Sequence, residues 1–348
     1  MSVLPKVNLE QMKLELVELV NIPSPSGFTE HIVQHLEGKL EQLGVATRRT
    51  AKGALLWTLK GKAGAARALA AHVDTLGAMV QSIGPNGRLK MTAIGGYDWT
   101  SVEGEYCQVH CQSGKVVSGT VVNIKQSVHV YGAGSRDIKR DSSTLEVRLD
   151  ENVHSAADVQ RLGIQVGDFI TWDVRAELTP SGYIKSRHLD NKAAVALCLA
   201  VTRAVVEEKL SLARDTHFFM SNYEEVGHGA AGGIPEDIEE LLCIDMAAVG
   251  TGQHSDEHSV SLCVKDSSGP YDQHMNAKLR ALAHDHGIRL RVDIYPYYSS
   301  DATAAWSAGA QYRAALVGPG VDASHAYERT HQDALEASYN LLMAYILN

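Results

Sequence analysis

The stretch "THFFMSNYEEVGHGAA", residues 216–231, passes from an apolar run to two adjacent glutamates and then to small residues. The apolar part is typical of a buried strand, and Glu224 and Glu225 close it. Open α/β sheets place their sites at the carboxyl ends of strands. Neighbouring strand residues point in opposite directions, so one glutamate could hold a metal ion while the other acts as a general base. A solvated turn is the alternative interpretation of this charge pair.

The composition is that of an ordinary globular protein. Of 348 residues, 45% are hydrophobic and 21% are charged. The net charge of −9 argues against nucleic acid and anionic membranes as partners, since both attract clustered Lys and Arg. Five cysteines are typical of a reducing compartment. The sequence holds no apolar run of about 18 residues, as a membrane helix would need. We therefore expect a cytoplasmic protein.

Apolar runs of strand type alternate with helical patterns in two parts of the chain. The expected helices are 29–43, 191–209, 272–287 and 333–346, and the expected strands are 54–61, 66–74, 216–223, 240–248 and 288–296. Alternating strands and helices predict an α/β sheet that is covered on both faces.

The middle of the chain has a different pattern. Between residues 76 and 181 short alternating runs are separated by turn residues, and Pro85-Asn86-Gly87 marks the turn of an expected hairpin. We therefore expect an all-β domain, 76–181, inserted into an α/β domain formed by 1–75 and 182–348.

Further acidic residues and histidines stand where strands end or helices begin. His72 and Asp74 end the run "ALAAHVD", so the carboxylate could hold the imidazole from behind. A satisfied core histidine is the alternative. Asp190 precedes the long helix, where it could be an N-cap or could face a site.

Asp245 lies between apolar neighbours in "LLCIDMAAV", and a buried acid needs a cationic partner such as a metal ion. His325 and His331 both precede the last helix, and either could be a ligand. Together these residues fit two metal ions that share a bridging carboxylate, an arrangement known in hydrolytic aminopeptidases and phosphatases. Mixed nitrogen and oxygen ligands suit zinc best, with cobalt or manganese as alternatives.

The ordered motifs "AHVDTLG", "RHLDNKAA", "YEEVGHGAA" and "LLCIDMA" resemble metallopeptidase family forty-two, the tetrahedral or glutamyl aminopeptidases with two metal ions. The resemblance covers nearly the whole chain. It implies an α/β/α catalytic domain with a mixed sheet and an inserted PDZ-like or barrel domain for dimerisation. It also implies homo-oligomers, either dimers or dodecamers built from dimers.

The resemblance implies five metal ligands, namely His72, Asp190, Glu225, Asp245 and His325. Within that set Asp190 would bridge the two ions. Glu224 would be the general base, and Asp74 would orient His72. The motif "SHAYE" favours His325 as the last ligand, with His331 as the alternative.

The chain departs from the family pattern at Thr75, where Glu is usual, and at Lys192, where Arg is usual. The motifs "DNKAA" and "YERTH" also resemble those of a subgroup associated with an osmoprotectant. The leading hypothesis is an aminopeptidase that removes N-terminal residues from short peptides. The alternative is a related metallo-deacylase or carboxypeptidase, because His-x-Asp-Thr occurs in that family too. A binding or scaffold protein with the same fold is a third hypothesis.

Overall fold

The computed structural model describes residues 4–62 and 64–348. The chain divides into two compact units. The first ends at Asp74 and resumes over Arg175–Asn348, and the second is Thr75–Val174.

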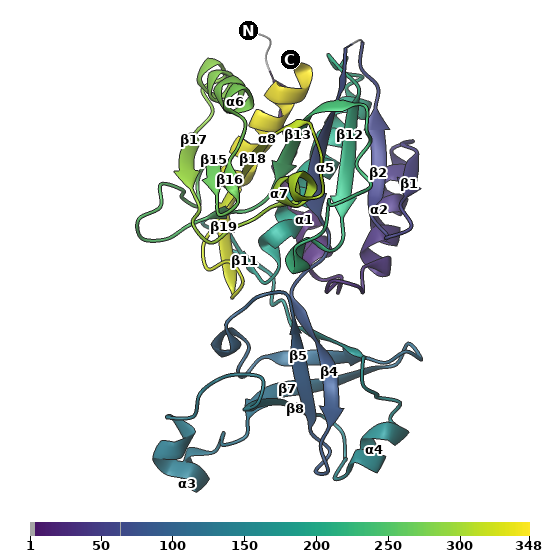
Figure 1. The fold of residues 1–348 in the computed structure, drawn as a ribbon, viewed down its shortest axis with the longest axis vertical. Helices are drawn as coiled ribbons and strands as arrows, with labels where there is room; N and C mark the ends of the chain where they lie inside the picture. Colours follow the sequence, from purple (N-terminus) through teal and green to yellow (C-terminus); the bar gives the residue numbers. More distant parts are fainter. Residues whose placement is uncertain (1–3, 63) are drawn as a thin grey trace. The chain divides into compact units, whose positions relative to one another are not determined.

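A mixed sheet is the centre of the first unit (Figure 1). Its strands follow the order β1-β2-β12-β3-β13-β18-β15-β16, while β14 pairs with β18 and β17 with β15. The four strands β12, β3, β13 and β18 are parallel neighbours, whereas β2 and β15 run antiparallel to their neighbours β12 and β18. The bounds are β1 Thr47–Arg49, β2 Leu55–Leu59, β3 Ala66–His72, β12 Thr216–Ser221, β13 Ile238–Ile244, β14 Ala247–Ala248, β15 Val260–Asp266, β16 Gly269–Pro270, β17 Leu290–Ile294 and β18 Arg313–Val321.

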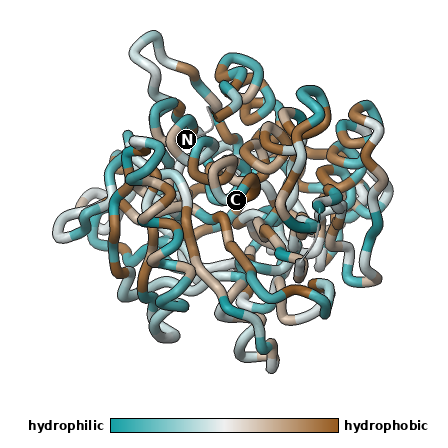
Figure 2. Tube along the Cα trace, turned by 90° about the horizontal axis from the view of Figure 1, so that it is seen from above, coloured by the Kyte–Doolittle hydropathy of each residue, from teal (hydrophilic) through white to brown (hydrophobic). Residues whose placement is uncertain are grey.

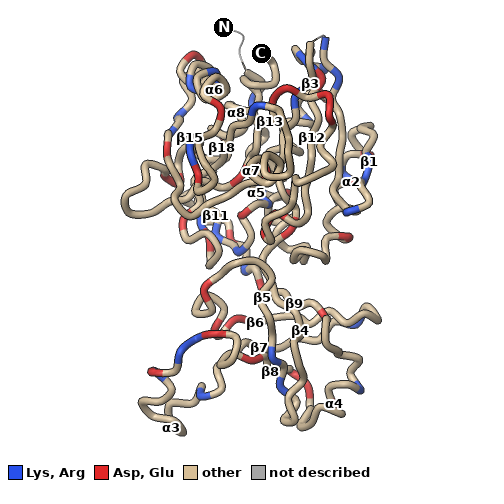
Figure 3. Tube along the Cα trace, viewed as in Figure 1, with Lys and Arg blue, Asp and Glu red and all other residues tan. Residues whose placement is uncertain are grey.

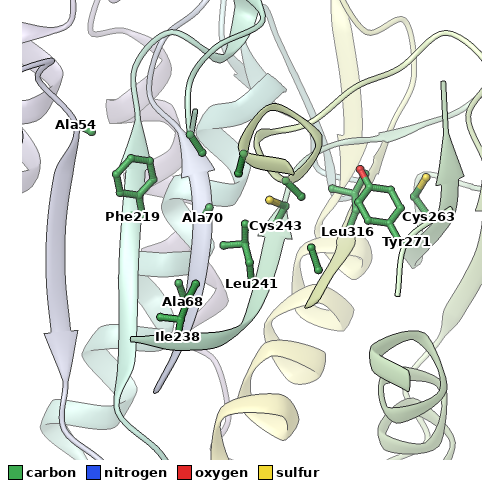
Figure 4. Packing of buried hydrophobic residues seen from close by; sticks show 14 of the residues in the cluster. Ala54, Ala68, Ala70, Phe219, Ile238, Leu241, Cys243, Cys263, Tyr271 and Leu316 are labelled. Carbon is green, nitrogen blue, oxygen red and sulfur yellow. The ribbon is translucent and has the colours of Figure 1, made fainter. Parts of the chain in front are cut away.

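Helices cover both faces of this sheet. They are α1 Leu9–Val20, α2 Glu30–Gln42, α5 Leu189–Glu207, α6 Gln273–Asp285, α7 Asp301–Ser307 and α8 Gln332–Leu347. Helix α5 contacts β3, β18, α1 and α8, and its residues 193–201 are buried on all sides. Helix α7 lies over the other face (Figure 1), where its residues Ala302 and Ala305 belong to one core cluster with Phe219, Leu241 and Cys243. Figure 4 shows the last three side chains on their strands. The predicted α/β class with a mixed sheet is confirmed.

The second unit is a closed barrel with the strand order β4-β5-β8-β7-β6-β9. Its elements are β4 Gly77–Ile83, β5 Leu89–Ile94, β6 Tyr106–His110, β7 Val116–Asn123, β8 Leu145–Leu149 and β9 Phe169–Trp172, with the short helices α3 Val128–Tyr131 and α4 Ala156–Arg161. Gly87 has a φ of 77° in the turn between β4 and β5, which forms the expected hairpin. Alternate strand residues such as Val80, Val109, Val121 and Val147 fill the interior.

A small sheet of β10 Glu177–Leu178, β11 Tyr183–Ser186 and β19 Glu328–His331 completes the first unit. Many turns at the outer edge of the trace are hydrophilic (Figure 2), and basic residues are scattered among acidic ones in both units (Figure 3). Within the described residues, every helix is too short or too polar to cross a membrane.

One local prediction was wrong. Strand β12 ends at Ser221, so Glu224 and Glu225 lie in the 3-10 helix η3, Glu224–Val226, and not at the end of the strand. At the start of α5, Asp190 and Asn191 both have non-helical dihedral angles, so the regular helix follows Asn191. At both places a distant carboxylate accepts a backbone N–H: Asp74 that of Glu224, and Glu328 that of Asp190.

Candidate metal centre

The candidate residues gather at one edge of the central sheet. His72 ends β3, Asp245 directly follows β13, and η3 follows β12 after a short turn. These three strands are parallel neighbours, so their carboxyl ends meet at the same edge. The start of α5 adds Asp190, and the loop between β18 and β19 adds His325.

Asp190 lies between the two histidines. Its Oδ1 is 3.1 Å from His72 Nε2, and its Oδ2 is 3.3 Å from His325 Nε2. Glu225 Oε2 lies 3.6 Å from His325 Nε2. On the other side Asp245 Oδ1 lies 3.8 Å from His72 Nε2. The two oxygens of Asp190 therefore face two different histidines.

Glu224 is the remaining acid of this cluster. Its Oε2 is 3.8 Å from His72 Nε2. The side chains of Glu224 and Glu225 are 13% and 2% exposed, although they are neighbours in sequence. Glu224 lies with His72 and Asp245, whereas Glu225 lies with His72 and Asp190 and also near His325. The division of the two glutamates into a general base and a metal ligand stays a prediction.

The charges in this cluster do not balance. Four carboxylates, those of Asp190, Glu224, Glu225 and Asp245, surround two imidazoles that can supply at most two positive charges. Glu225 Oε1 is buried and has no hydrogen-bond partner. Buried carboxylates with an unused oxygen are what a bound cation would satisfy, so the residues present fit divalent metal ions.

The pKa values show the same imbalance. Burial raises the pKa of Glu224 well above its usual value, and the charge of Asp245 adds to the effect. Burial and the charge of Asp190 likewise raise the pKa values of Glu225 and Asp245. Burial would also raise the pKa of Asp190, but hydrogen bonds from His325 and His72 outweigh it and hold that pKa below its usual range.

The ring of His72 is oriented as a metal ligand would need. Its Nδ1 lies 2.9 Å from the backbone oxygen of Asp74. A carbonyl oxygen can only accept, so Nδ1 carries a proton, and Nε2 is the nitrogen that faces the carboxylates and would be left for a metal ion. Burial lowers the pKa of His72, but Asp190 and Asp245 more than offset this and raise it well above the usual value.

The carboxylate of Asp74 has a different set of partners. It lies 3.6 Å from His72 Nδ1, but it accepts the backbone N–H groups of Glu224 at 3.2 Å and Glu225 at 3.3 Å. It also accepts the hydroxyl of Ser26. Asp74 is fully buried, so these bonds hold the η3 turn in place. Asp74 thus orients His72 through its backbone and the two glutamates through its side chain.

The structure brings His325 into the cluster and places His331 elsewhere. His331 Nδ1 accepts the backbone N–H of Asp333 at 3.1 Å as the cap of α8, and Nε2 donates to the oxygen of Ser181. Its neighbours are His258 and Asp333. His331 therefore lies outside the cluster around Asp190, in a separate group with His258 and Asp333.

Glu328 is a buried residue of the centre to which the sequence analysis gave no role. One of its oxygens accepts the backbone N–H of Asp190 and the other that of His325, both at 3.1 Å. Burial and the charge of Asp190 raise its pKa to about 8. The Glu of the motif "SHAYE" could have drawn attention to this position. Only the structure shows that its carboxylate binds the backbone of two candidate ligands.

Lys192, where the family usually has Arg, is fully buried beneath the centre. Its Nζ donates to Ser24 Oγ at 2.6 Å, and Ser24 in turn donates to the oxygen of Val73. Burial lowers the pKa of Lys192 to about 7. Lys192 therefore joins the start of α5 to the segment beside His72.

The cluster opens into a cavity of about 580 Å³. Besides the candidate ligands, most of its wall residues lie in the segment after β13 and in the loop after β17, with Gly227 after η3 and Ser324 between β18 and β19. These wall residues are Gly227, Met246, Ala248, Gln253, Tyr295, Pro296, Tyr297, Tyr298, Ser299 and Ser324. A cavity of this size beside buried acids suits a small ligand such as a short peptide end.

Comparison with known proteins agrees with this geometry. The model of the M42 glutamyl aminopeptidase family matches residues 53–341. A Bacillus subtilis (strain 168) protein named as an aminopeptidase, YhfE, is 48% identical over 335 residues, which are 96% of each chain. The glutamyl aminopeptidase of Lactococcus lactis subsp. cremoris (strain MG1363) is 25% identical over 195 residues, which cover 55% of this chain and 54% of that protein.

Solved structures share the fold at lower identity. The TET aminopeptidase of the archaeon Thaumarchaeota archaeon SCGC AB-539-E09 has a TM-score of 0.88 at 18% identity, covering 97% of each chain. The TET1 peptidase of Pyrococcus horikoshii has a TM-score of 0.86 at 20% identity, covering 97% of this chain and 99% of that one. The family match and the Bacillus relative together show that the chain is a peptidase and belongs to the M42 glutamyl aminopeptidase family.

Proposed function

We propose that this M42 peptidase is an aminopeptidase that uses two divalent metal ions and removes N-terminal residues from short peptides. The observation that carries the proposal is the position of Asp190, whose two oxygens face His72 and His325 at 3.1 and 3.3 Å. His72 and Asp245 would hold one ion, Glu225 and His325 the other, and Asp190 both. The nitrogen and oxygen ligands favour zinc, with cobalt or manganese as alternatives.

The ions would supply Lewis-acid activation of the peptide carbonyl and of water. In the proposed reaction Glu224 accepts the proton of the attacking water and delivers it to the leaving amine. Asp74 keeps Glu224 in position through the backbone of η3, as the 3.2 Å bond to Glu224 N supports.

The family match and the names of its relatives favour an aminopeptidase over a deacylase or carboxypeptidase. Thr75 keeps the deacylase or carboxypeptidase as a candidate, because it completes the His-x-Asp-Thr pattern that also occurs in that family. The separation of 1–75 and 182–348 as a catalytic domain from 76–181 as a dimerisation domain is part of the proposal, as is a homo-oligomer. A dodecamer is described for a TET relative, which supports such an assembly. Five cysteines without disulfides are consistent with the cytoplasm.

Metal content and turnover in matched variants test this proposal. Wild-type protein should bind two ions per chain in equilibrium dialysis followed by elemental analysis. Glu224→Gln should keep both ions and lose at least about 1000-fold in kcat, since a positioned general base contributes roughly 100- to 10,000-fold. Asp190→Ala should lose metal and activity together. Near-normal turnover by Glu224→Gln would refute the assigned base, and one tightly bound ion would refute the paired centre.

A further inference from the structure

One wall of the cavity is aromatic and apolar. Tyr295 and Tyr298 stand with ring centroids 5.3 Å apart and planes at 54° to each other. Met246 and Ala248 line the same cavity from the segment after β13. Met246 is buried and Ala248 is partly buried. These side chains form a surface on which a bulky apolar group can pack.

The polar groups of this wall already have partners. The hydroxyl of Tyr298 donates to the backbone oxygen of Met246 at 3.1 Å, and that of Tyr295 shares a 2.8 Å hydrogen bond with Ser255 Oγ. Gln253, in the amide orientation that satisfies its hydrogen bonds, donates from its nitrogen to Asp293 at 2.9 Å. The wall therefore has few donors left for a charged ligand.

The wall also has no cationic side chain that could pair with an acid. Among the described residues that line the cavity there is no Lys or Arg. Asp293 adds a carboxylate behind Gln253, and it accepts the backbone N–H groups of His254 and Ser255, both at 2.8 Å. An acidic side chain placed against this wall would have no Lys or Arg to pair with.

We propose that Met246, Ala248, Gln253, Tyr295 and Tyr298 form the pocket for the N-terminal side chain of the substrate, and that it selects bulky uncharged residues such as Phe and Leu and rejects Glu and Asp. This specificity rests on the proposed aminopeptidase function. It sets the chain apart from the glutamyl activity in the name of its family and of the Lactococcus relative. A basic side chain is not favoured either, because the carboxylate of Asp293 is already satisfied by hydrogen bonds.

Cleavage and binding test the pocket separately. Metal-loaded wild-type protein is given the peptides Phe-Ala-Ala, Leu-Ala-Ala, Glu-Ala-Ala and Lys-Ala-Ala, and kcat/KM is measured for each. We expect the Phe and Leu peptides to exceed the Glu peptide by at least about 100-fold, because a buried unpaired charge is a strong penalty. Calorimetry then measures binding of L-phenylalanine amide and L-glutamic acid α-amide to metal-loaded Glu224→Gln, which should not turn them over.

The outcomes distinguish a failure of the proposed specificity from a failure of the proposed aminopeptidase function. Best cleavage of the Glu peptide, or equal binding of the two amides, would overturn the pocket while the aminopeptidase function stands. If no peptide is cleaved but the phenylalanine amide binds at least about tenfold more tightly than the glutamic acid amide, the pocket is supported and the proposed function fails.

A substitution in the wall gives a gain-of-function test. Ala248→Lys places an ammonium group at the cavity and should raise kcat/KM for Glu-Ala-Ala relative to Phe-Ala-Ala by at least about tenfold. Ala248→Met is the matched control, since it adds similar length without charge and should not favour the Glu peptide. If Lys and Met change the ratio equally, then charge at this wall does not set specificity and the proposal is wrong.

Discussion

Replacement of Asp74 by Asn tests how the two glutamates are held. The carboxylate accepts the N–H of Glu224 on Oδ1 and the N–H of Glu225, with the Ser26 hydroxyl, on Oδ2. Asn keeps one acceptor but points an amide N–H₂ at the other partners. If the oxygen stays with Glu224, the buried N–H of Glu225 faces a donor. An unsatisfied buried donor costs about 1–3 kcal/mol, and the loss of a bond to a charged acceptor is of similar size.

We therefore expect Asp74→Asn to lower the free energy of unfolding by about 3 kcal/mol. This is measured by urea unfolding of the metal-free protein. Because the same bonds position Glu224 and Glu225, metal affinity or kcat/KM should fall by about 10- to 100-fold, as for other residues that orient metal ligands.

Ser26→Ala is the control for this change. It removes only the hydroxyl bonded to the same carboxylate, so it should cost about 1 kcal/mol and change kcat/KM by less than about fivefold. If Asp74→Asn unfolds and turns over like the wild type, Asp74 does not hold the turn and the reasoning is refuted.

Three further predictions concern the surroundings of the centre. A Cβ on Gly318 would lie 1.6 Å from the backbone oxygen of Asp245, so Gly318→Ala should destabilise the fold by about 3 kcal/mol and weaken metal binding; a stable variant with normal metal content would contradict this contact. Burial raises the pKa of Asp301 from 3.8 to about 6, so the stability from its protonated form is complete below pH 3.8 and is lost as the pH rises through about 6. Asp301→Asn should therefore remove about 3 kcal/mol of pH dependence in unfolding of the metal-free protein, and identical pH profiles for variant and wild type would disprove the assignment. His325→Ala should lower metal affinity at least about tenfold. His331→Ala should lose only a helix cap worth about 1 kcal/mol and keep its metal. The reverse result would make His331, and not His325, the last metal ligand.

Strand ends were the features most accessible from the sequence. Asp245 was suspected because an acid among apolar neighbours needs a partner, and the structure places it at the edge of the sheet with His72. The order of parallel strands made this edge predictable once the α/β pattern was recognised. The pairing of His72 with Asp190, 118 residues apart, came from the family resemblance and not from any local pattern.

Local turns were the features that the sequence could not fix. Glu224 and Glu225 were assigned to a strand, because the Asp74 carboxylate that bends the chain into η3 is 150 residues away. The sequence motif favoured His325 over His331, but it did not reveal the backbone that places His325, which has a φ of 64° and an N–H held by Glu328. The pocket wall at Tyr295 and Tyr298 lies beside β17 and could not be placed from composition or periodicity.

The most direct test of the central claim compares two short peptides that differ only at the N-terminus, one with a free amine and one N-acetylated. Metal-loaded protein should cleave the free peptide at least about 100-fold faster, a chelator should abolish the activity, and added zinc, cobalt or manganese should restore it. Comparable cleavage of the acetylated peptide would contradict the aminopeptidase and favour the deacylase or carboxypeptidase, with Thr75 as the first residue to examine.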